Sequence, residues 1–91
     1  MKKIGKALTR KIIFTFHSPT ADEVFVAGTF NNWEPRRDPL RKNAKGWSTV
    51  KYLEPGTYEY RFIVDGVWMD DPICQKHYPN QYGSENCVLE V

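Results

Sequence analysis

The sequence predicts an all-β domain, an immunoglobulin-like antiparallel β-sandwich of about six to eight short strands. Apolar side chains recur at every second position in several short segments, and Gly, Pro, Asn and Asp cluster between these segments. The 3.6-residue apolar period of a helix is not convincing anywhere. With 91 residues, 41% of them hydrophobic and 26% charged, the chain suits one domain with a single core.

The first two strands are expected near the N-terminus. Residues 11–17, KIIFTFH, place Ile12, Phe14 and Phe16 on one face at a period of two. Residues 23–28, EVFVAG, form a second short apolar run after the turn-forming SPTAD. We therefore expect one face of the first strand to lie on the core.

A third strand is expected at residues 46–53, GWSTVKYL, with Trp47 in the core. Its alternation is imperfect, because Trp47 and Leu53 share a parity that Val50 and Tyr52 do not. A β-bulge, which inserts one residue and moves later side chains to the other face, would explain this pattern. We therefore expect the register to shift within this strand.

Residues 57–64, TYEYRFIV, are the clearest strand in the chain. Asp65 and Gly66 follow it with the residue types that a two-residue hairpin turn requires, so residues 67–69 should return beside it. Residues 86–91 supply the last strand. The core-facing side chains of the clearest strand are expected to be Tyr58, Tyr60, Phe62 and Val64.

Charge is divided unevenly along the chain. Five of its 13 basic residues lie in residues 1–11 without an acidic one, which leaves the remainder with a net charge of −3. Residues 1–10 are expected to be a basic arm and residues 11–91 the single domain. A mildly acidic body argues against a nucleic-acid surface. Neither an apolar run of about 20 residues nor a secretory signal pattern is present, so we expect a cytoplasmic protein without membrane contact.

The two cysteines raise the question of a metal site. Cys74 and His77 form a Cys-x-x-His pair, and Cys87 and Asp71 are conceivable further ligands. Structural zinc sites usually show two tight ligand pairs, whereas the sequence offers one. We therefore expect two ordinary thiols, reduced in the cytosol, and no metal or other cofactor. The sequence leaves open whether the thiols ever pair with each other.

Trp33 and Trp68 are unusual because each lies at a turn or just beyond one, among Asn, Asp and Gly. In one interpretation they cap the open ends of the sandwich. In the other they form a platform, because an indole ring offers an apolar face to the C–H face of a sugar. Apolar stacking beside a few placed polar groups is the general design of small-ligand sites. Both interpretations remain open at this point.

Three segments carry a resemblance to a known family: VFVAGTFNNW at 24–33, GWSTVKYLEPGTYEYRFIVDGVWMDDP at 46–72 and GSENCVLEV at 83–91. In this order they strongly resemble the glycogen-binding domain of the AMP-activated protein kinase β subunit. The same family, carbohydrate-binding module family forty-eight, supplies the N-terminal domains of branching and debranching enzymes. The resemblance covers roughly residues 12–91. It implies an immunoglobulin-like sandwich that binds α-1,4-glucan (glycogen, starch or maltooligosaccharides) without catalysis.

The resemblance also implies a set of carbohydrate-binding residues. Trp33 and Trp68 match the two tryptophans that stack on successive glucose rings. Arg61 stands where the family usually has a lysine that donates to sugar hydroxyls; it still donates, but its planar fork has a different geometry. Asn86 matches an asparagine that binds hydroxyls, since an amide donates and accepts at once. Arg61 also has an alternative role, as an ion-pair partner on the sheet surface.

Three further polar residues are assigned around this set. Tyr82 stands where the kinase subunit has a leucine that packs into the glucan, and it either stacks on the sugar or remains a hydrated surface tyrosine. Ser84 falls at a polar position beside the site and is expected to add a weak contact. Asn32 is expected to shape its turn rather than to touch sugar.

Two other classes of function compete with sugar binding. A protein-interaction module on the same scaffold, with little or no sugar binding, would also use exposed aromatics, and a separate enzyme or kinase polypeptide is a candidate partner. An enzyme is disfavoured because His17 and His77 lie in no nucleophile motif. Asp70 and Asp71 should diverge on an extended chain, whereas glycoside hydrolysis needs converging carboxyl groups. Asp70 is expected to bond backbone amides in its turn instead.

Overall fold

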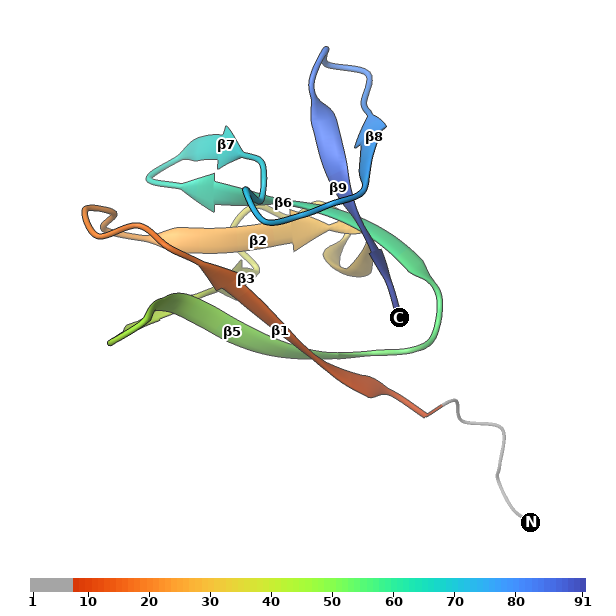
Figure 1. Ribbon diagram of the computed structural model, residues 1–91, viewed down its shortest axis with the longest axis horizontal. Helices are drawn as coiled ribbons and strands as arrows, with labels where there is room; N and C mark the ends of the chain where they lie inside the picture. The colour runs from red at the N-terminus through yellow and green to blue at the C-terminus, as the bar shows by residue number, and fades with distance from the viewer. Residues whose placement is uncertain (1–7) are drawn as a thin grey trace.

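The computed structural model describes residues 8–91 as two antiparallel sheets packed face to face (Figure 1). One sheet has the order β1-β5-β4; the other has the order β3-β2-β6-β9-β8, and β7 also pairs with β6. The all-β sandwich predicted from the sequence is confirmed. In chain order, the elements are β1 (Arg10–Phe16), β2 (Val24–Gly28), the 3-10 turn η1 (Thr29–Asn31), β3 (Asp38–Pro39), β4 (Arg41–Asn43), β5 (Gly46–Leu53), β6 (Thr57–Val64), β7 (Val67–Met69), β8 (His77–Pro79) and β9 (Glu85–Glu90).

The described residues thus contain nine strands, one more than the upper end of the expected range. The unforeseen strands are β3, β4 and β8, which have two or three residues each and no apolar alternation. Two of them contain a proline, Pro39 in β3 and Pro79 in β8. Both strands lie at the ends of their sheet, where the missing N–H of proline costs no ladder bond.

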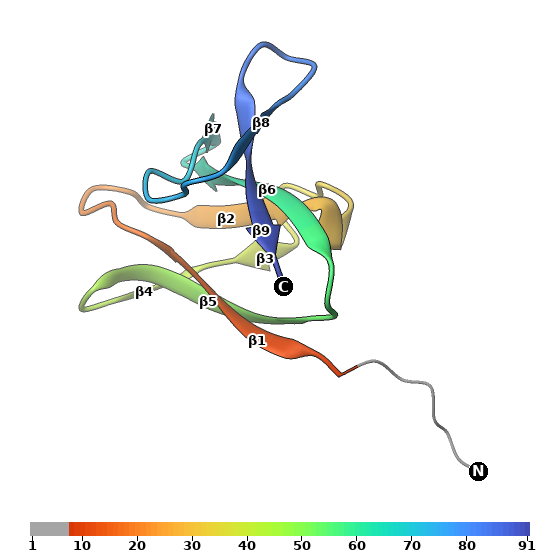
Figure 2. The same cartoon turned by 45° about the vertical axis from the view of Figure 1, so that its right-hand side comes forward.

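The core lies between the sheets, where β1 and β5 pass beneath β2 and β6 (Figure 2). Phe62, Val24, Val26 and Cys87 are its largest fully buried side chains. Burial raises the pKa of the Cys87 thiol to about 12, so the free side chain is a neutral part of this core. The predicted face of β1 is confirmed, because its even-numbered side chains Ile12, Phe14 and Phe16 pack here.

The register of β5 corrects one expectation. Its pairing with β1 runs without interruption from Arg10 opposite Leu53 to Phe16 opposite Trp47, so the expected bulge is wrong. Trp47 is buried, as predicted. The misleading signal came from Val50 and Tyr52, which face outward and are 43% and 63% exposed. In a sequence pattern, an apolar residue on the solvent face cannot be distinguished from a shift in strand register.

Strand β6 and its hairpin follow the prediction with one exception. Tyr60, Phe62 and Val64 are buried on the core side, whereas Tyr58, expected in the core with them, is only half-buried. Val64 pairs with Val67 across the turn, where Asp65 and Gly66 both have positive φ angles, 49° and 83°. Two successive positive φ angles are the signature of the hairpin turn that Asp-Gly favours.

Most of the basic arm expected over residues 1–10 lies outside the described residues, and β1 begins at Arg10. Within residues 8–91 the structure contains no helix that is long and apolar enough to cross a membrane.

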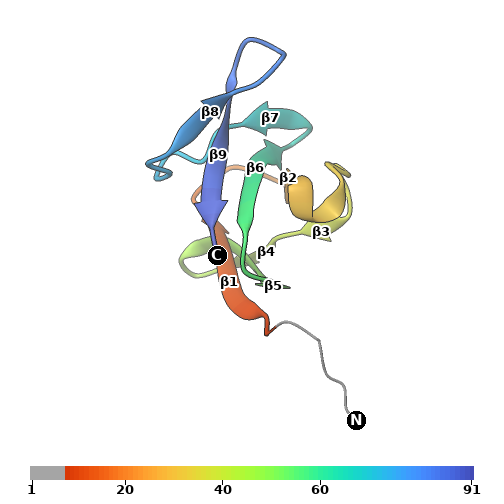
Figure 3. The same ribbon diagram turned by 90° about the vertical axis from the view of Figure 1, so that its right-hand side faces the viewer.

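Near the C-terminus, the β8–β9 hairpin extends beyond the rest of the domain (Figure 3). This hairpin and the β6–β7 hairpin frame a groove on the described surface.

Candidate functional site

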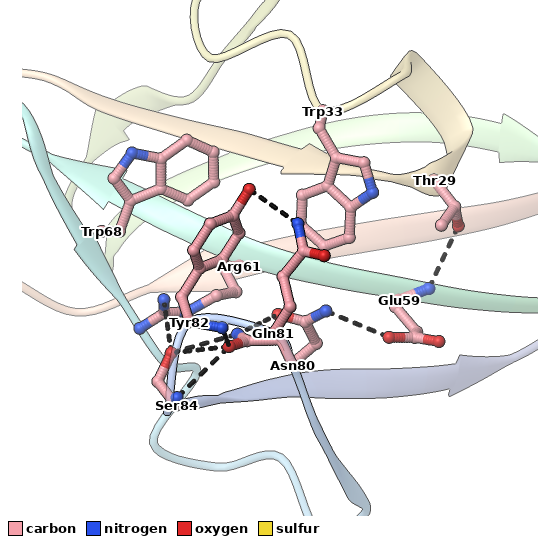
Figure 4. A pocket seen from close by; sticks show the side chains of 10 residues that line it. Thr29, Trp33, Glu59, Arg61, Trp68, Asn80, Gln81, Tyr82 and Ser84 are labelled. Atoms are coloured by element: carbon pink, nitrogen blue, oxygen red, sulfur yellow. Dashed lines mark hydrogen bonds between the residues drawn. The ribbon is translucent and has the colours of Figure 1, made fainter.

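A groove of about 950 Å3 lies on the outer face of the larger sheet (Figure 4). Glu59 and Arg61 of β6, which alternate with the core-facing Tyr60 and Phe62, form its floor, and β7 and the turns after β2 and β8 form its walls. All six site residues expected from the sequence line this groove. Among the described residues, its lining consists of Thr29, Trp33, Glu59, Arg61, Trp68, Asn80, Gln81, Tyr82, Ser84 and Asn86.

The turn that carries Trp33 is held by a buried asparagine. The amide oxygen of Asn31 accepts from the Gly28 N–H at 3.0 Å, and its Nδ2 donates to the Val26 carbonyl at 3.1 Å and to Asp38 Oδ2 at 2.7 Å. The Trp33 N–H closes the turn on the Gly28 carbonyl at 2.9 Å. No pattern in the sequence distinguishes Asn31 from its neighbours for this role.

Asn32 and Trp33 adopt a strained backbone conformation. Both have a φ of 59°, in the left-handed region where a residue other than glycine costs about 1–2 kcal/mol. Asparagine tolerates this region, so Asn32 shapes the turn as expected. A bulky tryptophan does so rarely, which indicates that the indole is held in place against a backbone cost.

The two indoles lie side by side rather than at opposite ends of the sandwich. Their ring centroids are 6.4 Å apart and their planes are inclined by 43°. Trp68 extends from β7 and remains 40% exposed. Trp33 is half-buried because one side of it packs on Phe25, Ala27 and Ile63. Trp33 thus covers a small apolar cluster, while both rings contribute to one surface.

Arg61 lies in the groove and forms an ion pair on the sheet surface, which was its alternative role. It lines the groove, and its guanidinium pairs with Asp70 Oδ1 at 3.0 Å and donates to Ser84 Oγ at 3.2 Å. Its side chain is 16% exposed, and Nε is buried without a hydrogen-bond partner among the described residues. The cation is therefore fixed by neighbours on both sides of the groove.

The adjacent aspartates diverge, as expected, but their roles differ from the prediction. Asp70 pairs with Arg61, so the expectation that it bonds backbone amides is wrong. Asp71 does this instead, because it accepts from the Ile73 N–H at 3.1 Å. Its other oxygen accepts from the Tyr60 hydroxyl at 2.6 Å in a buried contact. Burial, and then Asp71 itself, raise the pKa of Tyr60 far above its usual value, so the hydroxyl remains a donor.

The loop between β8 and β9 is organised by Asn80. Its amide oxygen accepts from the backbone N–H groups of Tyr82 at 2.9 Å and Ser84 at 3.2 Å. Its Nδ2 donates to Ser84 Oγ and to Asn86 Oδ1, both at 3.0 Å. Tyr82 is 82% exposed and its hydroxyl accepts from Gln81 Nε2 at 2.8 Å. This tyrosine faces the two indoles across the groove (Figure 4).

Asn86 is buried at the groove floor with bonds at both ends of its amide. It accepts from Asn80 and donates to Glu59 Oε1 at 3.0 Å. A primary amide has two N–H groups and two oxygen lone pairs, so one donor and one acceptor position remain for a ligand. Glu59 in turn bonds Thr29, whose Oγ1 accepts from its backbone N–H at 3.1 Å.

Four lining residues were missed by the sequence analysis: Thr29, Glu59, Asn80 and Gln81. The period of two could have identified Glu59, because it lies two positions from Arg61 on β6 and shares its face. The positions of the other three depend on the paths of loops. Together the lining offers flat apolar faces beside hydroxyl, amide, guanidinium and carboxylate groups, an arrangement suited to a polyhydroxylated ligand.

Comparison with known proteins places residues 10–91 in one family, described as the glycogen recognition site of AMP-activated protein kinase. The rice protein FLOURY ENDOSPERM 6, chloroplastic (Oryza sativa subsp. japonica), is 37% identical over 87 residues, which are 94% of this chain and 16% of that protein. The 5'-AMP-activated protein kinase subunit beta-2 of Homo sapiens is 36% identical over 69 residues, which are 76% of this chain and 25% of that subunit. The chain thus spans a minor part of each of these two proteins.

Proposed function

This chain belongs to the family of the glycogen recognition site of AMP-activated protein kinase, and from that premise we propose that it binds α-1,4-glucan without catalysis. The observation that carries the proposal is the pair of indoles, 6.4 Å apart on one groove with polar side chains around them. Each indole offers a face to a glucose ring, and the polar groups bond the hydroxyls. Glycogen, starch and maltooligosaccharides all present such rings.

The geometry of the groove favours weak, reversible binding. Its walls are open and Tyr82 is mostly exposed, so a bound chain remains partly hydrated. We expect a dissociation constant on the order of 10 μM to 1 mM, or roughly −4 to −7 kcal/mol. Such a domain localises an attached or associated protein at a polysaccharide, and clustering of copies raises the avidity. A separate enzyme or kinase polypeptide is the proposed protein partner.

The inclination of the indoles leads to a prediction about the linkage. Planes that differ by 43° suit a glucan whose successive rings turn, as in α-1,4 chains, and not the flat ribbon of β-1,4-linked glucose. Maltoheptaose should therefore bind at least about tenfold more tightly than cellohexaose, a difference of about 1.4 kcal/mol. Isothermal titration calorimetry with both sugars measures this ratio. Equal affinities, or tighter binding of the β-1,4 sugar, would contradict the proposed ligand class.

The alternative function, a protein-interaction module, has one observation in its favour. Ile13, Val50 and Tyr52 form an exposed apolar stripe on the outer face of the β1-β5-β4 sheet. The stripe lies on the other sheet from the groove, so it does not compete with sugar for the same surface. A folded domain that gives no heat and no spectral change with any α-glucan would favour this function. The cytoplasmic location remains a prediction.

A further inference from the structure

Three side chains that the groove does not use come together beside the β8–β9 hairpin. A ligand atom of His77 and the Sγ atoms of Cys74 and Cys87 all lie within 4.8 Å of one another. We propose that these residues bind one Zn2+ ion, with both cysteines as thiolates and His77 as a neutral imidazole. Cysteine sulfur and histidine nitrogen are the ligands that zinc prefers in proteins.

The fold creates this cluster by joining a pair visible in the sequence to a third residue. Cys74 and His77 are the Cys-x-x-His pair, which alone did not justify predicting a metal site. The antiparallel register places His77 directly opposite Cys87, and the Val88 N–H bonds the Lys76 carbonyl at 2.8 Å beside them. Backbone hydrogen bonds therefore fix two of the three ligands relative to each other.

The distances are close to those of a tetrahedral zinc site. Zn–S bonds of about 2.3 Å and Zn–N bonds of about 2.0–2.1 Å place neighbouring ligand atoms roughly 3.5–3.8 Å apart. The observed upper limit of 4.8 Å is wider by about 1 Å. Cys87 is fully buried and supplies a fixed point, whereas Cys74 is half-buried and His77 is exposed. Rotation of the latter two side chains closes the remaining gap.

The surroundings of His77 suit a metal-bound imidazole. Its Nε2 lies 3.1 Å from the Cys74 carbonyl oxygen, and its Nδ1 lies 3.8 Å from Glu85 Oε1. A metal-bound histidine usually donates its other N–H to a carbonyl or carboxylate, which fixes the tautomer. Whichever nitrogen takes the metal, the other has an oxygen acceptor close by.

The charge balance also favours a divalent cation. Two thiolates neutralise Zn2+, so the assembled site carries no net charge where Cys87 enters the core. In the free protein the Cys74 thiol is 3.1 Å from the Lys76 carbonyl and the Cys87 thiol 3.8 Å from the Asp71 carbonyl. Coordination replaces these weak bonds, because a thiol that binds a metal gives up its proton.

The fourth position belongs to water in this proposal. Asp71 was a conceivable fourth ligand in the sequence, but its carboxylate already bonds the Tyr60 hydroxyl and the Ile73 N–H. Zinc sites with three protein ligands complete their tetrahedron with a water molecule. The ion would link the turn at 71–74 to the β8–β9 hairpin, whose loop carries Asn80 and Tyr82 along the groove.

Cobalt provides the direct test, because Co2+ substitutes for Zn2+ and reports thiolate ligands by a charge-transfer band in the near ultraviolet. The protein is kept reduced with a phosphine, titrated with Co2+, and then with Zn2+ as the competitor. We expect one Co2+ per chain with this band, and its loss when Zn2+ is added. A reduced, folded protein that gives no such band at saturating Co2+ would overturn the proposal. The same holds if the protein is isolated with a Cys74–Cys87 disulfide and still binds no cobalt after reduction.

Variants identify the ligands while the fully buried Cys87 is left in place. Cys74→Ser and His77→Gln change half-buried and exposed side chains, and each should weaken Co2+ binding by roughly 10–100-fold or more. The matched control is His17→Gln, which removes the other histidine of the chain, exposed just after β1. It should bind Co2+ like the parent protein. Unchanged affinity in Cys74→Ser and His77→Gln would contradict the assigned ligand set.

Discussion

Replacing Trp68 with alanine is expected to abolish most glucan binding while the domain stays folded. A well-packed tryptophan at the centre of an interface contributes about 2–4 kcal/mol, so maltoheptaose affinity should fall by roughly 30-fold or more. The indole is 40% exposed on a strand of three residues, so the free energy of unfolding should change by less than about 1 kcal/mol. Calorimetric titration and urea denaturation measure the two effects separately.

Val67→Ala is the matched control for this experiment. Val67 lies on the same strand and is 56% exposed, but it does not line the groove. Its affinity for maltoheptaose should stay within about twofold of the parent value, or about 0.4 kcal/mol. Trp33→Ala should lose binding as well, with an added cost in stability because Trp33 packs on Phe25 and Ile63. If Trp68→Ala unfolds the domain, or binds as tightly as the parent, the platform interpretation is wrong.

The largest expected effect on stability comes from Asn31→Ala. The substitution removes three hydrogen bonds, of which those to the Gly28 N–H and the Val26 carbonyl are buried. Losing the partner of a buried polar group costs about 1–3 kcal/mol, so the free energy of unfolding should fall by about 3 kcal/mol. That is a large fraction of the roughly 5–15 kcal/mol that stabilises a small domain. Urea denaturation measures the loss.

Asn32→Gly is the neighbouring control. Asn32 is exposed and already in the left-handed conformation that glycine adopts without strain, so stability should change by no more than about 1 kcal/mol. A similar loss in both variants would mean that the turn, and not the Asn31 side chain, determines stability.

The strands were predictable where side chains on one face are buried and those on the other face are exposed or polar. β1 shows this alternation, and β6 shows it as far as Phe62, although Ile63 on its other face is buried. The Asp65-Gly66 turn has a backbone requirement that few residues meet. The prediction failed in β5, where exposed Val50 and Tyr52 break the alternation without a change in pairing. The short edge strands β3 and β8 were missed because they are too short to show a period.

The candidate site was predictable as a set of residues but not as a set of contacts. The six expected residues line one groove, yet the sequence did not show that Asp70 would pair with Arg61 or that Asn80 would organise the opposite wall. Those contacts depend on how hairpins and loops meet across the sheet. The meeting of His77 with Cys87 has the same origin, because strand register is not visible in a segment of three residues.

The most direct test of glucan binding is an NMR titration that follows the three indole N–H signals during addition of maltoheptaose. Trp33 and Trp68 line the groove, whereas Trp47 is buried in the core and its Nε1–H donates to the Ser18 carbonyl at 3.2 Å. The signals of Trp33 and Trp68 should shift together with one saturation curve, and the signal of Trp47 should stay where it is. Unmoved signals from Trp33 and Trp68 at saturating sugar would contradict the account.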